Sequence, residues 1–263
     1  HSEHGTSIVI KLNKDNEEFI DESRIRFLIN KYSEYINFPI NVQIGDKDEE
    51  RVNNNEAIWL KSKRSVKKDE YDEFYKYISH DFNEPLLTIH NKVEGKQEYS
   101  NLLYIPKKSP FDIWNRDTPK GLKLYIQRVF IMDDASHFLP LYLRFVKGVV
   151  DSNDLPLNVS REILQDHPLV HSIKTALTKR VIDSLRKLKK DDLSQYSEFW
   201  NEFGLVLKEG PAEEPSTKDD IAELFIFSST VNENNQINRS FDDYIASCKS
   251  DDKKIFYCIG ETY

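Results

Sequence analysis

The stretch DSNDLPLNVSREILQ, residues 151–165, marks the point where the chain changes from predicted strands to predicted helices. The residues just before it, Phe145–Val150, are predicted to form a strand. Pro156 then stiffens a turn, and Ser160 is a residue type that begins helices by accepting a hydrogen bond from backbone N–H groups. The chain therefore divides here into a part rich in strands and a part rich in helices.

Arg161 is the most unusual residue of this junction, because it stands at the predicted start of a helix. A guanidinium, backbone N–H groups without partners and the positive end of the helix dipole would together form an anion site. Gln165 lies one turn further along the same face. The alternative is an ion pair between Arg161 and a nearby carboxylate, such as Asp151 or Glu162, and spacing alone favours this alternative.

Downstream of the junction the pattern is helical. Apolar residues recur at steps of three or four, which predicts one long helix with a single apolar stripe. The members of this stripe are Leu169, Ile173, Leu177, Val181, Leu185 and Leu188. Further helices are predicted over 194–208, 217–228 and 242–249, followed by a strand over 254–259. The charged, proline-containing run EGPAEEPSTKD (209–219) is a predicted hinge.

Upstream of the junction, strands and helices alternate, which is typical of an α/β fold. Helices are predicted over 22–35, capped by Asp21, and over 69–79. Strands are predicted over 7–12, 40–44, 86–93, 99–105 and 123–132. The last of these, KLYIQRVFIM, is rich in β-branched and aromatic residues and is predicted to be a central strand.

The composition of the 263 residues excludes several classes of function. Lys and Arg number 37 against 45 Asp and Glu, a net charge of −8, which disfavours general nucleic-acid binding. No run is apolar enough for a membrane-spanning helix. Two cysteines make no disulfide framework, so we expect a reducing, cytoplasmic location. The 8 glycines form no phosphate-cradling motif, so the chain is not a self-sufficient nucleotide enzyme.

Large apolar residues also occur on stretches that are otherwise polar. Trp59 follows the charged run 45–56, and Phe111, Ile113 and Trp114 lie in the loop 107–121. They either form a surface that grips another protein or fold back onto the core, and the sequence leaves both readings open. Four basic residues border the loop and would attract acidic segments of a partner: they are Lys107, Lys108, Arg116 and Lys120.

His167 and His171 have the spacing of two metal ligands on one helix face. No acidic or cysteine ligand accompanies them at a suitable spacing, and Pro168 lies between them. A solvated helix start is therefore the favoured interpretation, and we expect no metal site.

Several runs resemble the middle segment of the heat-shock protein 90 chaperones, most closely the bacterial form. The most specific of them is DLPLNVSRE, within residues 154–162. The others are HDFNEPL (80–86), VEGKQEYSNLLYIP (93–106), IWNRD (113–117), GLKLYIQRVFIMDDA (121–135), ALTKRV (176–181) and FGLVLKEGPAE (203–213). The resemblance covers most of the chain.

The resemblance implies an α/β (α+β) architecture in three parts. These are a large three-layer α-β-α subdomain over 1–190, a short helical coil over 191–224 and a smaller, incomplete α/β subdomain over 225–263. The family's N-terminal ATP-binding domain and C-terminal dimerisation domain are expected to lie outside this chain.

The resemblance also implies an ATP-hydrolysing chaperone that binds ATP and Mg²⁺ mainly through its N-terminal domain. The middle segment completes the ATPase site, so the isolated segment is not expected to hydrolyse ATP. Implied partners are unfolded or partly folded client proteins, the chaperone's own N-terminal domain, a DnaK-type chaperone and, at full length, a second copy of the protein. The alternative is a stand-alone protein-interaction module with no catalytic role.

Individual residues match functional positions of the family. Arg161 matches a γ-phosphate-contacting arginine, Gln165 a second catalytic-loop residue, and Asn158 lies in the same loop. Phe130 matches a phenylalanine that supports this loop from behind. Trp59 matches an aromatic implicated in client binding and conformational response. The loop that contains Phe111, Ile113 and Trp114 resembles an amphipathic, client-facing loop of the family.

Overall fold

The computed structural model describes residues 4–115, 122–158, 160–231, 237–248 and 254–260. The α-helices are α1 (Glu22–Ser33), α2 (Lys68–Ser79), α3 (Arg161–Gln165), α4 (Pro168–Asp191), α5 (Leu193–Leu207), α6 (Gly210–Glu213), α7 (Lys218–Ala222) and α8 (Phe241–Ser247). The strands are β1 (Asn41–Val42), β2 (Glu50–Arg51), β3 (Pro85–Val93), β4 (Tyr99–Pro106), β5 (Leu122–Ile126), β6 (Val129–Ala135) and β7 (Lys147–Ser152). The short 3₁₀ helices are η1 (Lys14–Ile20), η2 (Ile58–Leu60), η3 (Ser136–Phe138), η4 (Leu141–Leu143) and η5 (Pro215–Thr217).

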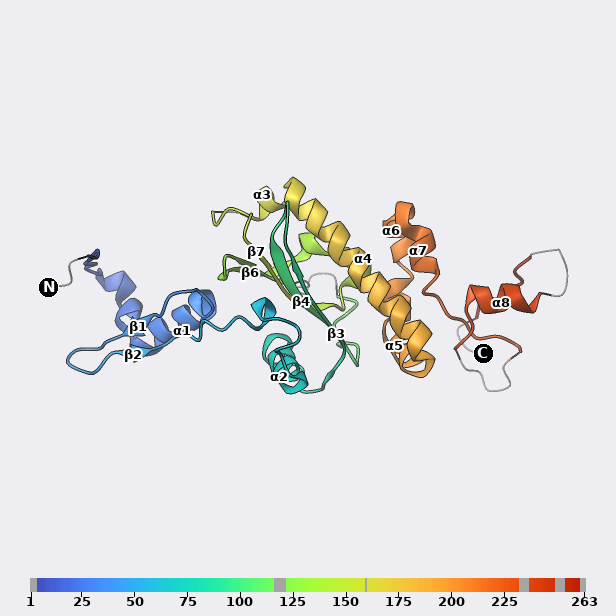
Figure 1. The fold of residues 1–263 in the computed structure, drawn as a ribbon, viewed down its shortest axis with the longest axis horizontal. Coiled ribbons are helices and arrows are strands. Elements are labelled where there is room, and N and C mark those ends of the chain that lie inside the picture. The colour runs from blue at the N-terminus through green and yellow to red at the C-terminus, as the bar shows by residue number, and fades with distance from the viewer. Residues whose placement is uncertain (1–3, 116–121, 159, 232–236, 249–253, 261–263) are drawn as a thin grey trace.

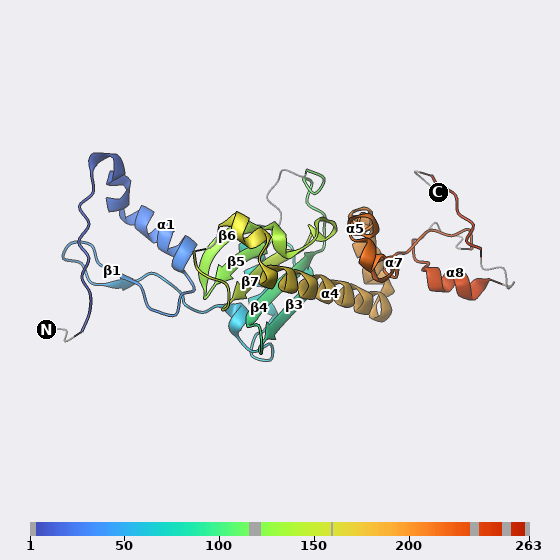
Figure 2. The same ribbon diagram turned by 90° about the horizontal axis from the view of Figure 1, so that it is seen from above.

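A mixed sheet organises the described part of the chain. Its strand order is β3-β4-β7-β5-β6, with β5 and β7 parallel and the other neighbours antiparallel. A two-stranded sheet, β1-β2, lies with α1 toward the N-terminal end, and α8 lies toward the other end (Figure 1 and Figure 2). Helices together with a mixed sheet confirm the predicted α/β class.

Helices cover both faces of the sheet. Along β4, Leu103 and Ile105 belong to a core cluster that includes residues of α4 and α5. The alternate residues Leu102 and Tyr104 belong to a second cluster, against which α2 packs. This alternation follows from the two-residue period of a strand, and it places the sheet between two helical layers (Figure 1).

The long helix α4 confirms the predicted apolar stripe. Leu169 is partly buried, and the other five members of the stripe are buried in the core beneath the sheet. The helix begins at Pro168, where His167 Nδ1 accepts a hydrogen bond from the backbone N–H of Leu169 at 3.2 Å. His167 therefore serves as a helix cap.

The run KLYIQRVFIM forms a hairpin, so the prediction of one central strand over 123–132 is wrong. The chain reverses at Gln127 and Arg128, which have φ angles of 50° and 67°. Such turns usually contain asparagine or glycine, so the turn carried no recognisable signal. The central strand is instead β7, which lies between β4 and β5, and the second half of the run forms the edge strand β6.

Two other predicted strands do not form. Residues 7–12 and 254–259 are described but lie outside any strand, and most of their apolar side chains are exposed. A strand pattern becomes a strand only where another strand pairs with it. The region 225–263, predicted to be a small α/β layer, therefore contributes α8 and one isolated bridge, Phe227 to Arg239, within its described residues.

Gly148 is expected to be essential for stability, because the backbone of its neighbouring strand β4 lies very close to it. Its φ is +143°, and an added Cβ would lie 2.2 Å from the carbonyl oxygen of Leu102. We expect Gly148→Ala to lower the free energy of unfolding by about 3 kcal/mol or more. Denaturant unfolding measures this loss.

Gly95 provides the matched control, since its φ of +141° is nearly the same but nothing lies within 4 Å of an added Cβ. Gly95→Ala should therefore cost only about 1 kcal/mol. Equal losses for the two variants would show that the contact with β4 is unimportant.

Candidate functional site

The loop 153–165, which follows β7 and includes the short helix α3, contains the predicted anion-binding residues. Leu155 and Leu164, near its two ends, are buried in the core. Between them, Leu157, Asn158 and Ser160 are exposed. The loop is therefore held near both ends, while Leu157, Asn158 and Ser160 between them face solvent.

The predicted helix start is confirmed. α3 begins at Arg161, and the backbone N–H of Leu164 donates to the carbonyl oxygen of Ser160 at 3.1 Å. Gln165 is exposed. The side chain of Arg161 lies outside the described part of the structure, so its predicted phosphate contact remains a prediction.

Asp151 anchors the end of β7 from inside the protein. Its Oδ2 accepts from Trp59 Nε1 at 2.8 Å, and its Oδ1 accepts from the backbone N–H of Arg128 at 3.2 Å. Burial raises the pKa of Asp151, although these hydrogen bonds act in the opposite direction. Both carboxylate oxygens thus have donors within the protein.

Trp59 connects this anchor to other parts of the chain through its ring and its backbone carbonyl group. Its ring packs at centroid distances of 4.7 Å from Tyr35 and 4.8 Å from Tyr125. His90 Nε2 donates to the carbonyl oxygen of Trp59 at 3.0 Å, and the Tyr71 hydroxyl donates to His90 Nδ1 at 2.6 Å. Burial lowers the pKa of His90, which favours the neutral ring that accepts from Tyr71 at Nδ1.

A surface position for Trp59 is wrong, because its side chain is 0% exposed. Ile113 is buried as well. These two apolar side chains therefore fold back onto the core. The polar stretches that flank these two segments gave no sign of this, because the packing partners are far away along the chain.

Phe130 lies in the same aromatic cluster as Trp59. Its ring centroid is 5.6 Å from that of Tyr125 and 5.8 Å from that of Tyr32 on α1. Tyr125 in turn contacts Trp59, which holds Asp151 at the end of β7. Phe130 is thus linked to the end of β7 through Tyr125 and Trp59, and its predicted supporting role remains a prediction.

The loop 107–115 presents two large apolar side chains to solvent. Phe111 is 100% exposed and Trp114 is 56% exposed. Lys107 lies 3.7 Å from Glu84, and Lys108 forms a 2.8 Å ion pair with Glu202, so both cations have acidic partners. The predicted rim residues Arg116 and Lys120 lie outside the described residues.

Glu202 fixes the start of this loop. It accepts from Lys108 Nζ at 2.8 Å and from the backbone N–H of Ser109 at 2.9 Å. Burial would raise the pKa of Glu202, but the hydrogen bonds from Lys108 and Ser109 outweigh it and hold the pKa below its ordinary value. The carboxylate therefore remains charged over the physiological pH range.

Arg144 is a residue of this region that the sequence analysis missed. It is buried beneath the loop and pairs with Glu209. A sequence signal was present: a single arginine interrupts the apolar run LPLYLRFV (139–146). A charge inside such a run must find a partner if the run is buried, because an unpaired buried charge is very costly.

The described ranges contain no cluster of three or more histidine, cysteine, aspartate or glutamate residues placed to hold a metal ion. Among the helices of those same ranges, none combines the length and apolar character that crossing a membrane requires.

Comparison with known proteins gives a consistent result. Residues 41–263 match the family model described as Hsp90 protein. The chain is 49% identical, over 100% of its length, to the chaperone protein HtpG of Salmonella typhimurium. It is 50% identical to the HtpG proteins of Pasteurella multocida, over 99% of the chain, and of Idiomarina loihiensis, over 98%. In each case it spans 43% of the relative's length.

Proposed function

This chain belongs to the Hsp90 family, and we propose that it acts as the ATPase-completing and client-binding middle segment of an ATP-driven molecular chaperone. The observation that carries the proposal is about 50% identity to HtpG chaperones over almost the whole chain. The proposal includes a cytoplasmic location, dimerisation at full length and cooperation with a DnaK-type chaperone.

The first part of the proposal concerns the loop 153–165. ATP and Mg²⁺ would be held mainly by the N-terminal domain of the full-length protein, because this segment has no phosphate-cradling motif. The exposed middle of the loop and the helix start at Arg161 fit a contact with an anionic group on another domain. Bound ATP would supply the transferable phosphoryl group.

Within that arrangement, residues of this chain would stabilise the negative charge of the phosphate and hold the loop in position. Arg161 would offset the negative charge at the terminal phosphate, and Gln165 would assist from the next turn. The buried residues Leu155 and Leu164 would hold the loop in position. Hydrolysis would then depend on docking of the two domains.

The second part of the proposal concerns the client. Phe111 and Trp114 are large, exposed apolar side chains on one short loop, bordered by charged residues. An aromatic anchor surrounded by polar groups is typical of protein-binding sites. We propose that these two side chains contact apolar segments of unfolded or partly folded proteins.

The double substitution Phe111→Ala with Trp114→Ala is expected to weaken client binding by about 1–3 kcal/mol. Stability should change little, because Phe111 is fully exposed and Trp114 is more than half exposed. Titration of a permanently unfolded model client against the full-length protein measures the affinity, and thermal melts check the fold.

Phe82→Ala is the matched control, since Phe82 is 90% exposed but lies outside this loop. It should leave client affinity unchanged. If the control weakens binding as much as the loop variant, binding depends on exposed apolar surface in general and the assignment to this loop is wrong.

A further inference from the structure

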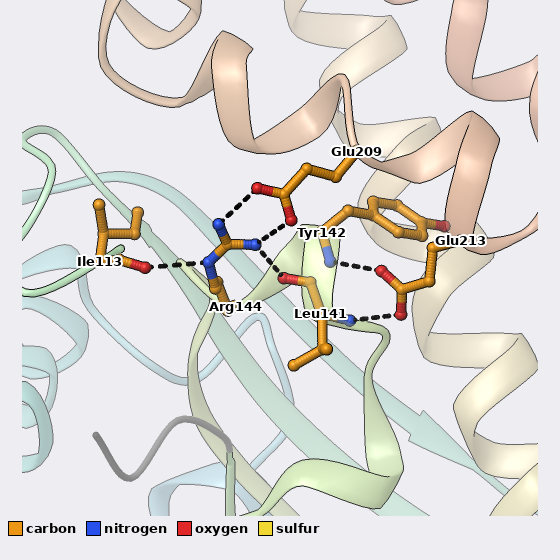
Figure 3. A network of polar contacts seen from close by, with 6 residues as sticks. All are labelled: Ile113, Leu141, Tyr142, Arg144, Glu209 and Glu213. Carbon is orange, nitrogen blue, oxygen red and sulfur yellow. Dashed lines mark hydrogen bonds and ion pairs between the residues drawn. The ribbon is translucent and has the colours of Figure 1, made fainter. Parts of the chain in front are cut away.

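Arg144 is almost completely buried, and every nitrogen of its guanidinium donates a hydrogen bond. Only 5% of its side chain is exposed. Its two terminal nitrogens each donate to one carboxylate oxygen of Glu209, both at 2.7 Å. One terminal nitrogen also donates to the carbonyl oxygen of Leu141, and Nε donates to the carbonyl oxygen of Ile113, both at 3.0 Å (Figure 3). The arginine therefore joins η4, the loop 107–115 and the N-terminal end of α6.

Trp114 lies over this same guanidinium. The distance from the Arg144 guanidinium carbon to the centroid of the Trp114 ring is 5.6 Å, within the range of a cation–π contact. More than half of the Trp114 side chain nevertheless remains exposed. The indole is thus supported from inside the protein by Arg144, while the rest of its surface is open to a partner.

Two further glutamates of the α5–α6 segment hold the surrounding chain. Glu202 accepts hydrogen bonds from Lys108 and Ser109 at the start of the loop. Glu213 accepts from the backbone N–H groups of Leu141 at 2.8 Å and Tyr142 at 3.0 Å, beside Arg144 (Figure 3). Loop and helices thus form one hydrogen-bonded unit, with Arg144 at its centre.

We propose that Arg144 is the positioning residue of the client-facing loop: it holds the Trp114 indole in the orientation that meets an extended apolar segment of an unfolded protein. This inference rests on the proposed client-binding role of Phe111 and Trp114. Arg144 fixes both the backbone carbonyl of Ile113 and the ring of the next residue, Trp114. Fixing adjacent backbone and side chain in advance reduces the conformational entropy lost when a client binds.

The chemistry requires arginine in particular. A lysine could keep the charge near Glu209, but it has no planar face for the indole and no second arm for the Ile113 carbonyl. A buried ion pair is also weak evidence for a purely stabilising role, since apolar residues of similar volume often serve stability as well or better. The specific geometry therefore points to orientation of the loop.

The test uses the full-length protein and the variant Arg144→Lys, with and without Trp114→Ala. We expect Arg144→Lys to weaken binding of an unfolded model client roughly three- to tenfold, the range for loss of a cation–π contact and its loop bond. In the Trp114→Ala background, the same substitution should cause no further loss of affinity. The emission of Trp114, obtained as the difference from a matched Trp114→Phe protein, should shift to longer wavelength.

Two more variants complete the design. Glu209→Gln leaves Arg144 in place and weakens its ion pair. It should therefore also weaken client binding and shift the Trp114 emission to longer wavelength, even if Arg144→Lys folds poorly. Arg186→Lys is the control, because Arg186 pairs with Asp183, Asp220 and Glu223 on α4 and α7 outside the loop. It should change neither client affinity nor Trp114 emission.

The possible failures are distinguishable. Unchanged affinity and emission in both the Arg144 and Glu209 variants, while Trp114→Ala still weakens binding, would overturn the positioning role alone. Equal losses from Arg144→Lys in both backgrounds would also overturn it, because the effect would not pass through Trp114. If Trp114→Ala leaves client affinity intact, the proposed client site itself fails, whatever the emission shows.

Discussion

Trp59→Ala is expected to lower the free energy of unfolding by about 3–5 kcal/mol, whereas Trp114→Ala should lower it by less than about 1 kcal/mol. Trp59 is fully buried, packs against Tyr35 and Tyr125, and donates to the buried Asp151 carboxylate. Its removal would leave both a cavity and a buried acceptor without its donor. Trp114 contacts Arg144 but is largely exposed.

Denaturant unfolding of the two variants measures this difference directly. Trp59→Phe helps to separate the two contributions, because it keeps an aromatic ring in the core while removing the N–H donor to Asp151 and only part of the side-chain volume. We expect it to cost about 1–3 kcal/mol, the penalty of leaving one buried acceptor unpaired. Similar losses for Trp59→Ala and Trp114→Ala would contradict the core position of Trp59.

Arg161→Ala in the full-length protein is expected to reduce kcat for ATP hydrolysis by roughly 10- to 1000-fold while leaving ATP affinity nearly unchanged. In the proposed mechanism, the Arg161 guanidinium would stabilise charge that develops at the terminal phosphate in the transition state, whereas the N-terminal domain would provide the ground-state binding. Steady-state hydrolysis and nucleotide titration on the same preparation measure the two quantities.

Arg161→Lys should recover part of the rate, since lysine retains the charge but not the planar fork. Arg180→Ala is a suitable control, because Arg180 donates to Asn91 within this segment at 2.7 Å. Normal kcat in a folded Arg161→Ala protein would restore the alternative that Arg161 forms only an ion pair.

Much of the fold could be predicted from local pattern. The stripe of α4 and the strands β3 and β4 were predictable because period and burial agree over a long stretch. The β5–β6 hairpin was not, because Gln127 and Arg128 adopt positive φ without the residues that normally mark such a turn. The strand patterns at 7–12 and 254–259 were misleading because no strand pairs with them in the described chain.

The candidate site was only partly predictable, because its supports come from distant residues. Trp59 and Asp151 are separated by 92 positions, and Arg144 and Glu209 by 65. No local pattern encodes such pairs, so the burial of Trp59 and the role of Arg144 emerge only from the packed structure. The exposed positions of Phe111 and Trp114 agree with the reading of an amphipathic loop.

Hydrogen–deuterium exchange of the loop 153–165 in the full-length protein tests the central claim most directly. The claim is that this loop contacts the nucleotide-bound N-terminal domain. Adding a non-hydrolysable ATP analogue should slow exchange in peptides that cover this loop, because docking would shield the exposed residues Leu157, Asn158 and Ser160 from water. Protection confined to the N-terminal domain, with unchanged exchange in this loop, would contradict the claim.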